Sequence, residues 1–151
     1  MRCWNTRIMV IMTFVGTLLF GMGLAQAGNT AKVKVAVIHA TKAKAPKDPA
    51  LKKIEKSLKT AFGGYKSFKQ LDKQVLKLTA GKPANIKLPG AQKARLTYKG
   101  KKGKRHMMTL AIPKSKVNVD LRVPARKLFY QAGIPYKNGI LILAFYLKEK
   151  K

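Results

Sequence analysis

The spacing of apolar residues changes along the chain, and this change constrains the fold more than any other feature. Between residues 48 and 62 they recur every three or four positions, whereas beyond residue 74 short runs alternate and are bounded by glycine or proline. The first spacing is typical of a helix packed through one face, and the second of half-buried strands. The pattern therefore predicts one helix followed by several antiparallel strands.

The predicted helix begins at Asp48 and Pro49, because a carboxylate can cap the first amides and proline suits the first helical position. Its apolar face consists of Leu51, Ile54, Leu58 and Phe62. Gly63 and Gly64 are expected to end the helix, since glycine tolerates the left-handed conformation. A strand over residues 33–38 is predicted before the helix, because β-branched residues crowd that segment.

About six strands are predicted after the helix. They lie within residues 74–79, 85–88, 93–99, 105–112, 116–123 and 140–147, with 127–131 pairing more loosely. The loop 100–104 joins two of them in a hairpin, and the last is apolar on both faces, which places it in the centre of a sheet. We therefore expect an α+β fold: an N-terminal strand and one amphipathic helix, followed by an antiparallel β meander that curls into a sandwich or half-barrel. The helix would cover one sheet face.

The first 27 residues have the three zones of a secretory signal peptide. Arg2 and Arg7 supply positive charge, residues 8–24 carry none, and Ala25, Gln26 and Ala27 match the small-x-small cleavage pattern. A transmembrane anchor is the competing interpretation, but an uncharged run of 17 residues with three glycines is short for a bilayer span. We expect cleavage after Ala27, leaving residues 28–151 as a single basic domain without a transmembrane span.

The cysteine content indicates where such a domain resides. Cys3 is the sole cysteine and lies in the predicted signal peptide, so the exported domain would contain no disulfide. Export without disulfides suits a bacterial envelope better than a small eukaryotic secreted domain. The expected location is the periplasm, the outer envelope or the extracellular space.

Three short segments resemble those of small exported bacterial proteins of uncharacterised function. They are residues 65–71 (YKSFKQL), the turn 81–84 (GKPA) before 88–90 (LPG), and the closing 136–142 (YKNGILI). The resemblance covers most of the exported domain. It implies an envelope or extracellular address and no particular activity.

Catalysis, metal binding and cofactor binding are not expected, because the required residue types are scarce. The exported domain contains only Asp48, Glu55, Asp72, Asp120, Glu149, His39 and His106. Asp48 is explained as a helix cap and Glu55 as a surface ion-pair partner, whereas Asp72 and Asp120 have no evident structural role. The two histidines are 67 positions apart, and neither has a cysteine or carboxylate at ligand spacing. His106 is expected to face inward with its apolar strand neighbours.

Basic residues are the one positive signal, with 33 Lys+Arg against 5 Asp+Glu and a formal net charge of +28. Removal of Arg2 and Arg7 would leave +26. The predicted polyanion-binding residues are Lys93, Arg95, Lys99, Lys101, Lys102, Lys104, Arg105, Lys116 and Arg122. Those from 99 to 105 crowd a glycine-flanked hairpin tip that we expect to be flexible. Lysine acts as a point charge, so binding should be nonspecific.

The sequence therefore predicts a non-enzymatic exported protein that associates electrostatically with an anionic polymer or membrane surface. DNA, lipopolysaccharide, anionic phospholipid and acidic polysaccharide all fit. One alternative is that the lysines only keep the protein soluble. Another is a structural or accessory subunit of an envelope assembly, which needs an apolar patch or an open strand edge. A protein partner would then dock at a sheet edge or at residues 125–136, which include Leu128, Phe129, Tyr130 and Tyr136. Packing of these four side chains in the core is the alternative, and the one that we favour.

Overall fold

The computed structural model describes residues 30–148. The predicted signal peptide, its cleavage site and Glu149 lie outside the described residues. Within residues 30–148 the chain forms eight strands, one α-helix and two short 3-10 segments. No helix in this part of the chain is long and apolar enough to cross a membrane.

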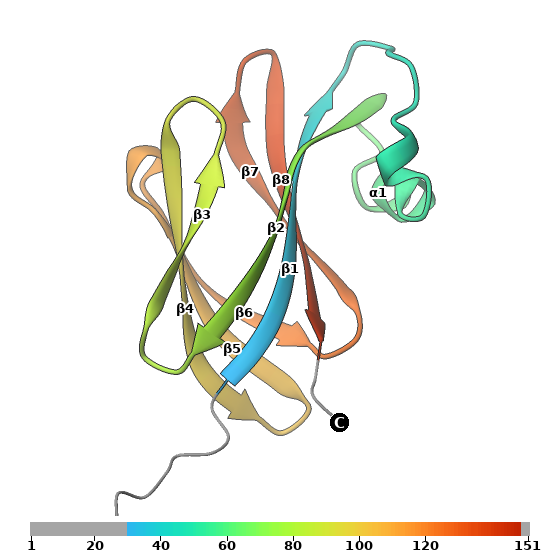
Figure 1. Ribbon diagram of the computed structural model, residues 1–151. Coiled ribbons are helices and arrows are strands. Elements are labelled where there is room, and N and C mark those ends of the chain that lie inside the picture. The colour runs from blue at the N-terminus through green and yellow to red at the C-terminus, as the bar shows by residue number, and fades with distance from the viewer. Residues whose placement is uncertain (1–29, 149–151) are drawn as a thin grey trace, which may run out of the picture.

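The strands form two four-stranded antiparallel sheets (Figure 1). The first sheet has the order β2-β1-β8-β7, with β2 at Ser67–Thr79, β1 at Thr30–Thr41, β8 at Gly139–Lys148 and β7 at Leu128–Tyr136. The second sheet has the order β3-β4-β5-β6, with β3 at Pro83–Leu88, β4 at Gln92–Lys102, β5 at Arg105–Ile112 and β6 at Val117–Pro124. Neighbouring strands pair antiparallel throughout.

The two sheets share one core, because alternate side chains of each strand point toward the opposite sheet. Val33, Val35 and Val37 of β1 are fully buried there, as are Leu110 and Ile112 of β5. β8 is buried on both faces and lies between β1 and β7, so the predicted central position of this strand is confirmed.

The helical segment covers one end of the outer face of the first sheet (Figure 1). It consists of a 3-10 turn η1 at Pro49–Leu51 and the helix α1 at Glu55–Ala61, so the prediction of one continuous helix is wrong. The predicted apolar face is confirmed, since Leu51 and Leu58 are buried and Ile54 and Phe62 pack beside them.

Asp48 caps the first turn and ties it to β2. Its Oδ1 accepts a hydrogen bond from the Ala50 amide at 2.9 Å, and its Oδ2 accepts one from the Gln70 amide of β2 at 2.8 Å. The carboxylate thereby holds η1 against β2, and α1 begins four residues after η1. Neither Gly63 nor Gly64 adopts a positive φ, so the predicted left-handed ending is also wrong.

The predicted α+β class holds only coarsely, because the protein is β-rich with one short helix. The N-terminal strand does not stand before a meander: β1 lies inside its sheet and pairs with both β2 and β8. Only β3 to β6 form a meander, and the chain passes from one sheet to the other after β2 and after β6. Strand alternation predicts a strand but not its neighbours, which explains the difference.

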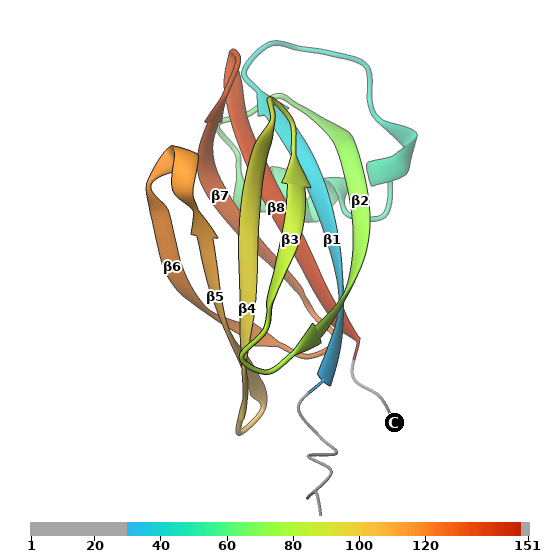
Figure 2. The ribbon, with the colours of Figure 1, turned by 60° about the vertical axis from the view of Figure 1, so that its left-hand side comes forward.

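The hairpin between β4 and β5 has longer paired strands and a shorter turn than predicted. Lys101 pairs with His106 and Lys102 with Arg105, so the turn contains only Gly103 and Lys104. Gly100 has φ +113° and marks a bulge in β4, not a loop. The hairpin extends beyond the other strands at one end of the molecule (Figure 2).

Candidate polyanion-binding face

The outer face of the β3–β6 sheet, which we call the cationic face, carries the candidate site. Inward positions such as Ala94, Leu96, Leu110 and Val123 are buried, so the intervening side chains point to solvent. Seven of the outward residues are basic: Lys87, Lys93, Arg95, Lys99, Lys102, Arg105 and Arg122. Among the described residues of this face, Asp120 is the one carboxylate.

Register brings these cations together across neighbouring strands. Lys87 lies opposite Lys93 at one end of the sheet. Lys102 lies opposite Arg105 at the other end, where the hairpin extends. Arg122 of β6 is opposite Met107 of β5 and completes the group at the hairpin end. The charges therefore run along the whole length of the face.

A shallow hollow of about 260 Å³ lies at the hairpin end of the cationic face. It is lined by Lys102, Arg105, Met107 and Arg122. Three cations around one apolar side chain can hold a phosphate, sulfate or carboxylate group, because guanidinium groups donate hydrogen bonds in a planar fork.

Asp120 lies on the cationic face and has two partners there. Its Oδ1 accepts hydrogen bonds from the Thr109 hydroxyl at 2.6 Å and from Lys99 Nζ at 3.0 Å. The bond from Thr109, followed by that from Lys99, lowers the pKa of Asp120, so the carboxylate stays ionised at neutral pH. Asp120 therefore neutralises Lys99. This ion pair and the bond to Thr109 give Asp120 the structural role that the sequence did not reveal.

We expect Asp120→Asn to strengthen polyanion binding, because Asn keeps the partner of Thr109 but releases Lys99 as an additional cation. A plot of log affinity for a DNA duplex against log salt concentration should become steeper by about 0.9, the value for one further phosphate contact. Glu55→Gln is the matched control, since Glu55 is also paired with a lysine but lies in α1, away from the β3–β6 sheet. An equal change in both variants would mean that net charge alone, not the cationic face, determines binding.

The nine predicted binding residues do not all reach this face. Six do, namely Lys93, Arg95, Lys99, Lys102, Arg105 and Arg122. Lys101 pairs with the buried His106 and so projects from the opposite side of the hairpin, and Lys104 lies in the turn. Lys116 precedes β6 at the far end, with φ +52°. Lys87 also lies on this face although it was not among the predicted residues, and its alternation with Ile86 and Leu88 in the predicted strand is the signal that it faces solvent.

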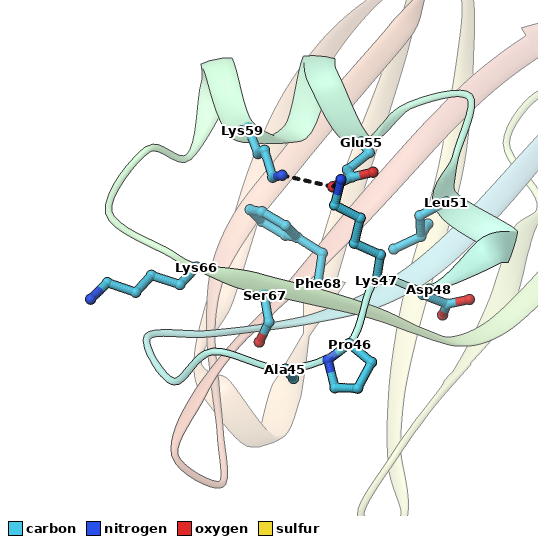
Figure 3. A pocket seen from close by; sticks show the side chains of 10 residues that line it. All are labelled: Ala45, Pro46, Lys47, Asp48, Leu51, Glu55, Lys59, Lys66, Ser67 and Phe68. Carbon is cyan, nitrogen blue, oxygen red and sulfur yellow. Dashed lines mark ion pairs between the residues drawn. The ribbon is translucent and has the colours of Figure 1, made fainter.

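Within residues 30–148, each carboxylate outside the cationic face has a hydrogen-bond or ion-pair partner. A hollow of about 110 Å³ lies beside α1 (Figure 3). In its lining, Lys59 Nζ lies 2.7 Å and Lys47 Nζ 3.8 Å from Glu55 Oε1. The Lys59 hydrogen bond lowers the pKa of Glu55, and the amides of Gln70 and Ala50 lower that of Asp48. General-acid catalysis at neutral pH requires a raised carboxyl pKa, whereas the pKa values of Glu55 and Asp48 are both lowered.

Asp72 also has a structural role. It accepts a hydrogen bond at 2.7 Å from the side-chain amide of Gln74, which in turn bonds both the N–H and the C=O of Lys87. Gln74 thus links the edge strands β2 and β3 of the two sheets. Within residues 30–148 no group of three or more His, Cys, Asp or Glu side chains is placed to hold a metal ion.

The histidines belong to the packed interior or its margin. His106 faces inward as predicted and is 4% exposed, with its Nδ1 2.9 Å from the Tyr98 hydroxyl. The ring of His39 packs edge-on against Tyr136, with centroids 5.1 Å apart.

Residues 125–136 form mostly the edge strand β7, where the sequence suggested that a protein partner would dock. Phe129 and Tyr136 pack against the main core, and Tyr130 contacts Phe62 and donates a hydrogen bond to Ser57 at 3.0 Å. Leu128 alone of the four apolar candidates is exposed. A bulge near Gly133 interrupts the edge, and such bulges oppose pairing with another strand.

The chain was compared with models of protein families, with curated proteins and with solved structures, and no match was found in any of the three comparisons.

Proposed function

We propose that this protein is an exported, non-enzymatic binding protein whose cationic face associates with anionic polymers of the cell envelope or its surroundings. One observation carries the proposal: seven cations and a single carboxylate share one outward sheet face. Solubility alone calls for a surface on which both signs are mixed. The export component rests on the signal-peptide pattern of the first 27 residues.

The shape of the face favours a polymer over a small anion. Nine residue steps separate Lys93 from Lys102 on β4, which corresponds to about 30 Å at about 3.3 Å per residue. A single phosphate or carboxylate contacts only a few of these cations at once. A polyanion or an extended anionic surface contacts all of them together.

The distribution of arginine also supports a binding role. Three of the four arginines among the described residues, Arg95, Arg105 and Arg122, lie on this face. Their planar forks bind phosphate, sulfate and carboxylate groups with two hydrogen bonds. No outward residue of the described β3–β6 sheet is aromatic, so the face lacks the stacking platforms that hold single-stranded bases. We therefore expect binding to be insensitive to nucleotide sequence, and DNA, lipopolysaccharide and acidic polysaccharide to compete.

The direct test is a variant in which Arg95, Lys102, Arg105 and Arg122 are all replaced by Gln. These side chains are exposed, so the fold should persist. With only two cations left that are not paired with Asp120, affinity for a DNA duplex or heparin should fall by roughly a hundredfold or more at about 50 mM salt. Fluorescence anisotropy of a labelled duplex measures the change.

The matched control replaces Lys42, Lys44, Lys52 and Lys56 by Gln. These four are exposed and lie in the loop and helical segment of the other sheet, so the variant has the same net charge but an intact cationic face. It should retain most of the affinity. If both variants weaken binding equally, the cations act only through net charge and the proposal is wrong.

A further inference from the structure

The helical segment leaves part of the outer face of the first sheet uncovered (Figure 1). Beyond α1, one cross-strand row runs through Val75, Lys34, Tyr146 and Leu128, as the pairings of β2, β1, β8 and β7 require. Val75 is 52% and Leu128 38% exposed, and they are two of the three exposed large apolar side chains of residues 30–148. This row, which we call the strip, therefore exposes an apolar side chain at each edge of the sheet, with Lys34 and Tyr146 between them.

A groove of about 530 Å³ lies between this strip and the helical segment. Its lining is mostly apolar and comes from both the sheet and the helical segment. The residues other than lysine are Ala36, Ala50, Ile54, Leu128, Ala144 and Tyr146, together with Gln70. A hollow of this volume is within the range of small-molecule sites, which are apolar with a few polar groups at defined positions.

The polar groups at the rim of the groove are three lysines. Lys34 comes from β1, Lys53 from the segment before α1, and Lys73 from β2, and all three are exposed. The next cross-strand row, Lys77, Lys32 and Lys148, adds more positive charge beyond Lys34.

No carboxylate among the described residues lines the groove to balance these charges. Asp48 is held by the amides of Ala50 and Gln70, and Glu55 by Lys59. Asp72 bonds Gln74, and Asp120 belongs to the other sheet. The groove therefore combines an apolar floor with a cationic rim, which is complementary to an anionic amphiphile.

We propose that this groove binds a long-chain fatty carboxylate, with the acyl chain on the apolar floor and the carboxylate among Lys34, Lys53 and Lys73. Burial of each methylene of the chain supplies affinity, and the ammonium groups select the negative head. This site is separate from the cationic face and goes beyond the polymer binding proposed above. A long-chain carboxylate is favoured over a membrane surface because the hollow is bounded by the helical segment on one side.

The test uses dodecanoate below its critical micelle concentration, with binding measured by calorimetry and by amide chemical shifts. Dodecanoate should bind at least about tenfold more tightly than acetate, which lacks the chain, and than dodecyltrimethylammonium, which has the opposite charge. The shifts should centre on Ala36, Ala144 and Leu128. Acetate binding equally well, or shifts centred on Arg105 and Arg122, would overturn the proposal.

Two variants and their matched controls locate the site. Leu128→Ser should weaken dodecanoate binding about tenfold, whereas Leu71→Ser should not, because Leu71 is 37% exposed but lies outside the groove. Replacing Lys34 and Lys73 by Gln should also weaken dodecanoate binding about tenfold. Replacing Lys42 and Lys44 by Gln should leave the affinity unchanged, because these two lysines lie outside the groove. If Leu71→Ser is as harmful as Leu128→Ser, or if the protein binds anionic vesicles but no monomeric dodecanoate, the groove is not a fatty-carboxylate site.

Discussion

Raising the salt concentration from about 50 to 200 mM is expected to weaken binding of a DNA duplex roughly a thousandfold. The estimate follows from the cationic face itself. Of its seven cations, Lys99 is already paired with Asp120, and no other cation of the face forms an ion pair with a described residue. Six phosphate contacts give a slope of about −5 for log affinity against log salt concentration, because each neutralised phosphate releases condensed counterions.

Duplexes of different sequence should give the same slope and nearly the same affinity, and heparin should compete for the same face. The variant that lacks Arg95, Lys102, Arg105 and Arg122 should have a slope of only about −2, since about two contacts remain. Binding that persists at high salt would contradict electrostatic association. A strong preference for one base sequence would contradict it as well, because it requires specific contacts that this face does not offer.

Gly139→Ala is expected to be the most damaging small substitution in the fold. A Cβ at Gly139, where β8 begins beside β1, would collide with the backbone carbonyl oxygen of Ala40 and approach His39 Nε2 to 3.1 Å. Because the obstacle is backbone, the central pair of strands must separate locally. We expect a loss of about 3 kcal/mol in the free energy of unfolding. The melting temperature should fall by roughly 10 °C, measured by circular dichroism.

Gly64→Ala is the control for this substitution. Gly64 follows α1, has no positive φ, and a Cβ there would have no atom within 4 Å. The free energy of unfolding of this variant should change by no more than about 0.5 kcal/mol. A melting temperature for Gly139→Ala as high as that of Gly64→Ala would mean that β1 and β8 do not approach each other as described.

Local pattern predicted some elements well and others only in part, since β2 begins at Ser67, seven residues before the strand predicted at 74–79. The strand at Arg105–Ile112 has the predicted bounds, and the buried strand Gly139–Lys148 lies inside its sheet as expected. The stripe of Leu51 and Leu58 faces the sheet. These features depend on burial of alternate or helically spaced side chains, which is a property of short sequence windows.

Gly100 illustrates what local pattern missed. A glycine between lysines suggested a flexible loop, whereas it forms a bulge within a paired strand and the turn follows three residues later. The register after the bulge determines that Lys102 lies on the cationic face, whereas Lys101 projects from the opposite side of the hairpin. Cross-strand pairing is a long-range property, so a lysine-rich run does not reveal which of its members face the same way.

The sequence by itself determined the excess of positive charge, the type of most elements and the inward position of His106. Only the tertiary structure decided that six predicted cations and Lys87 share one face while Lys101, Lys104 and Lys116 do not. It also decided that the helical segment leaves Val75 and Leu128 of its sheet exposed in the same cross-strand row as Lys34. The physical reason is that composition and periodicity depend on neighbours along the chain, whereas a binding surface depends on which strands pair and in what register.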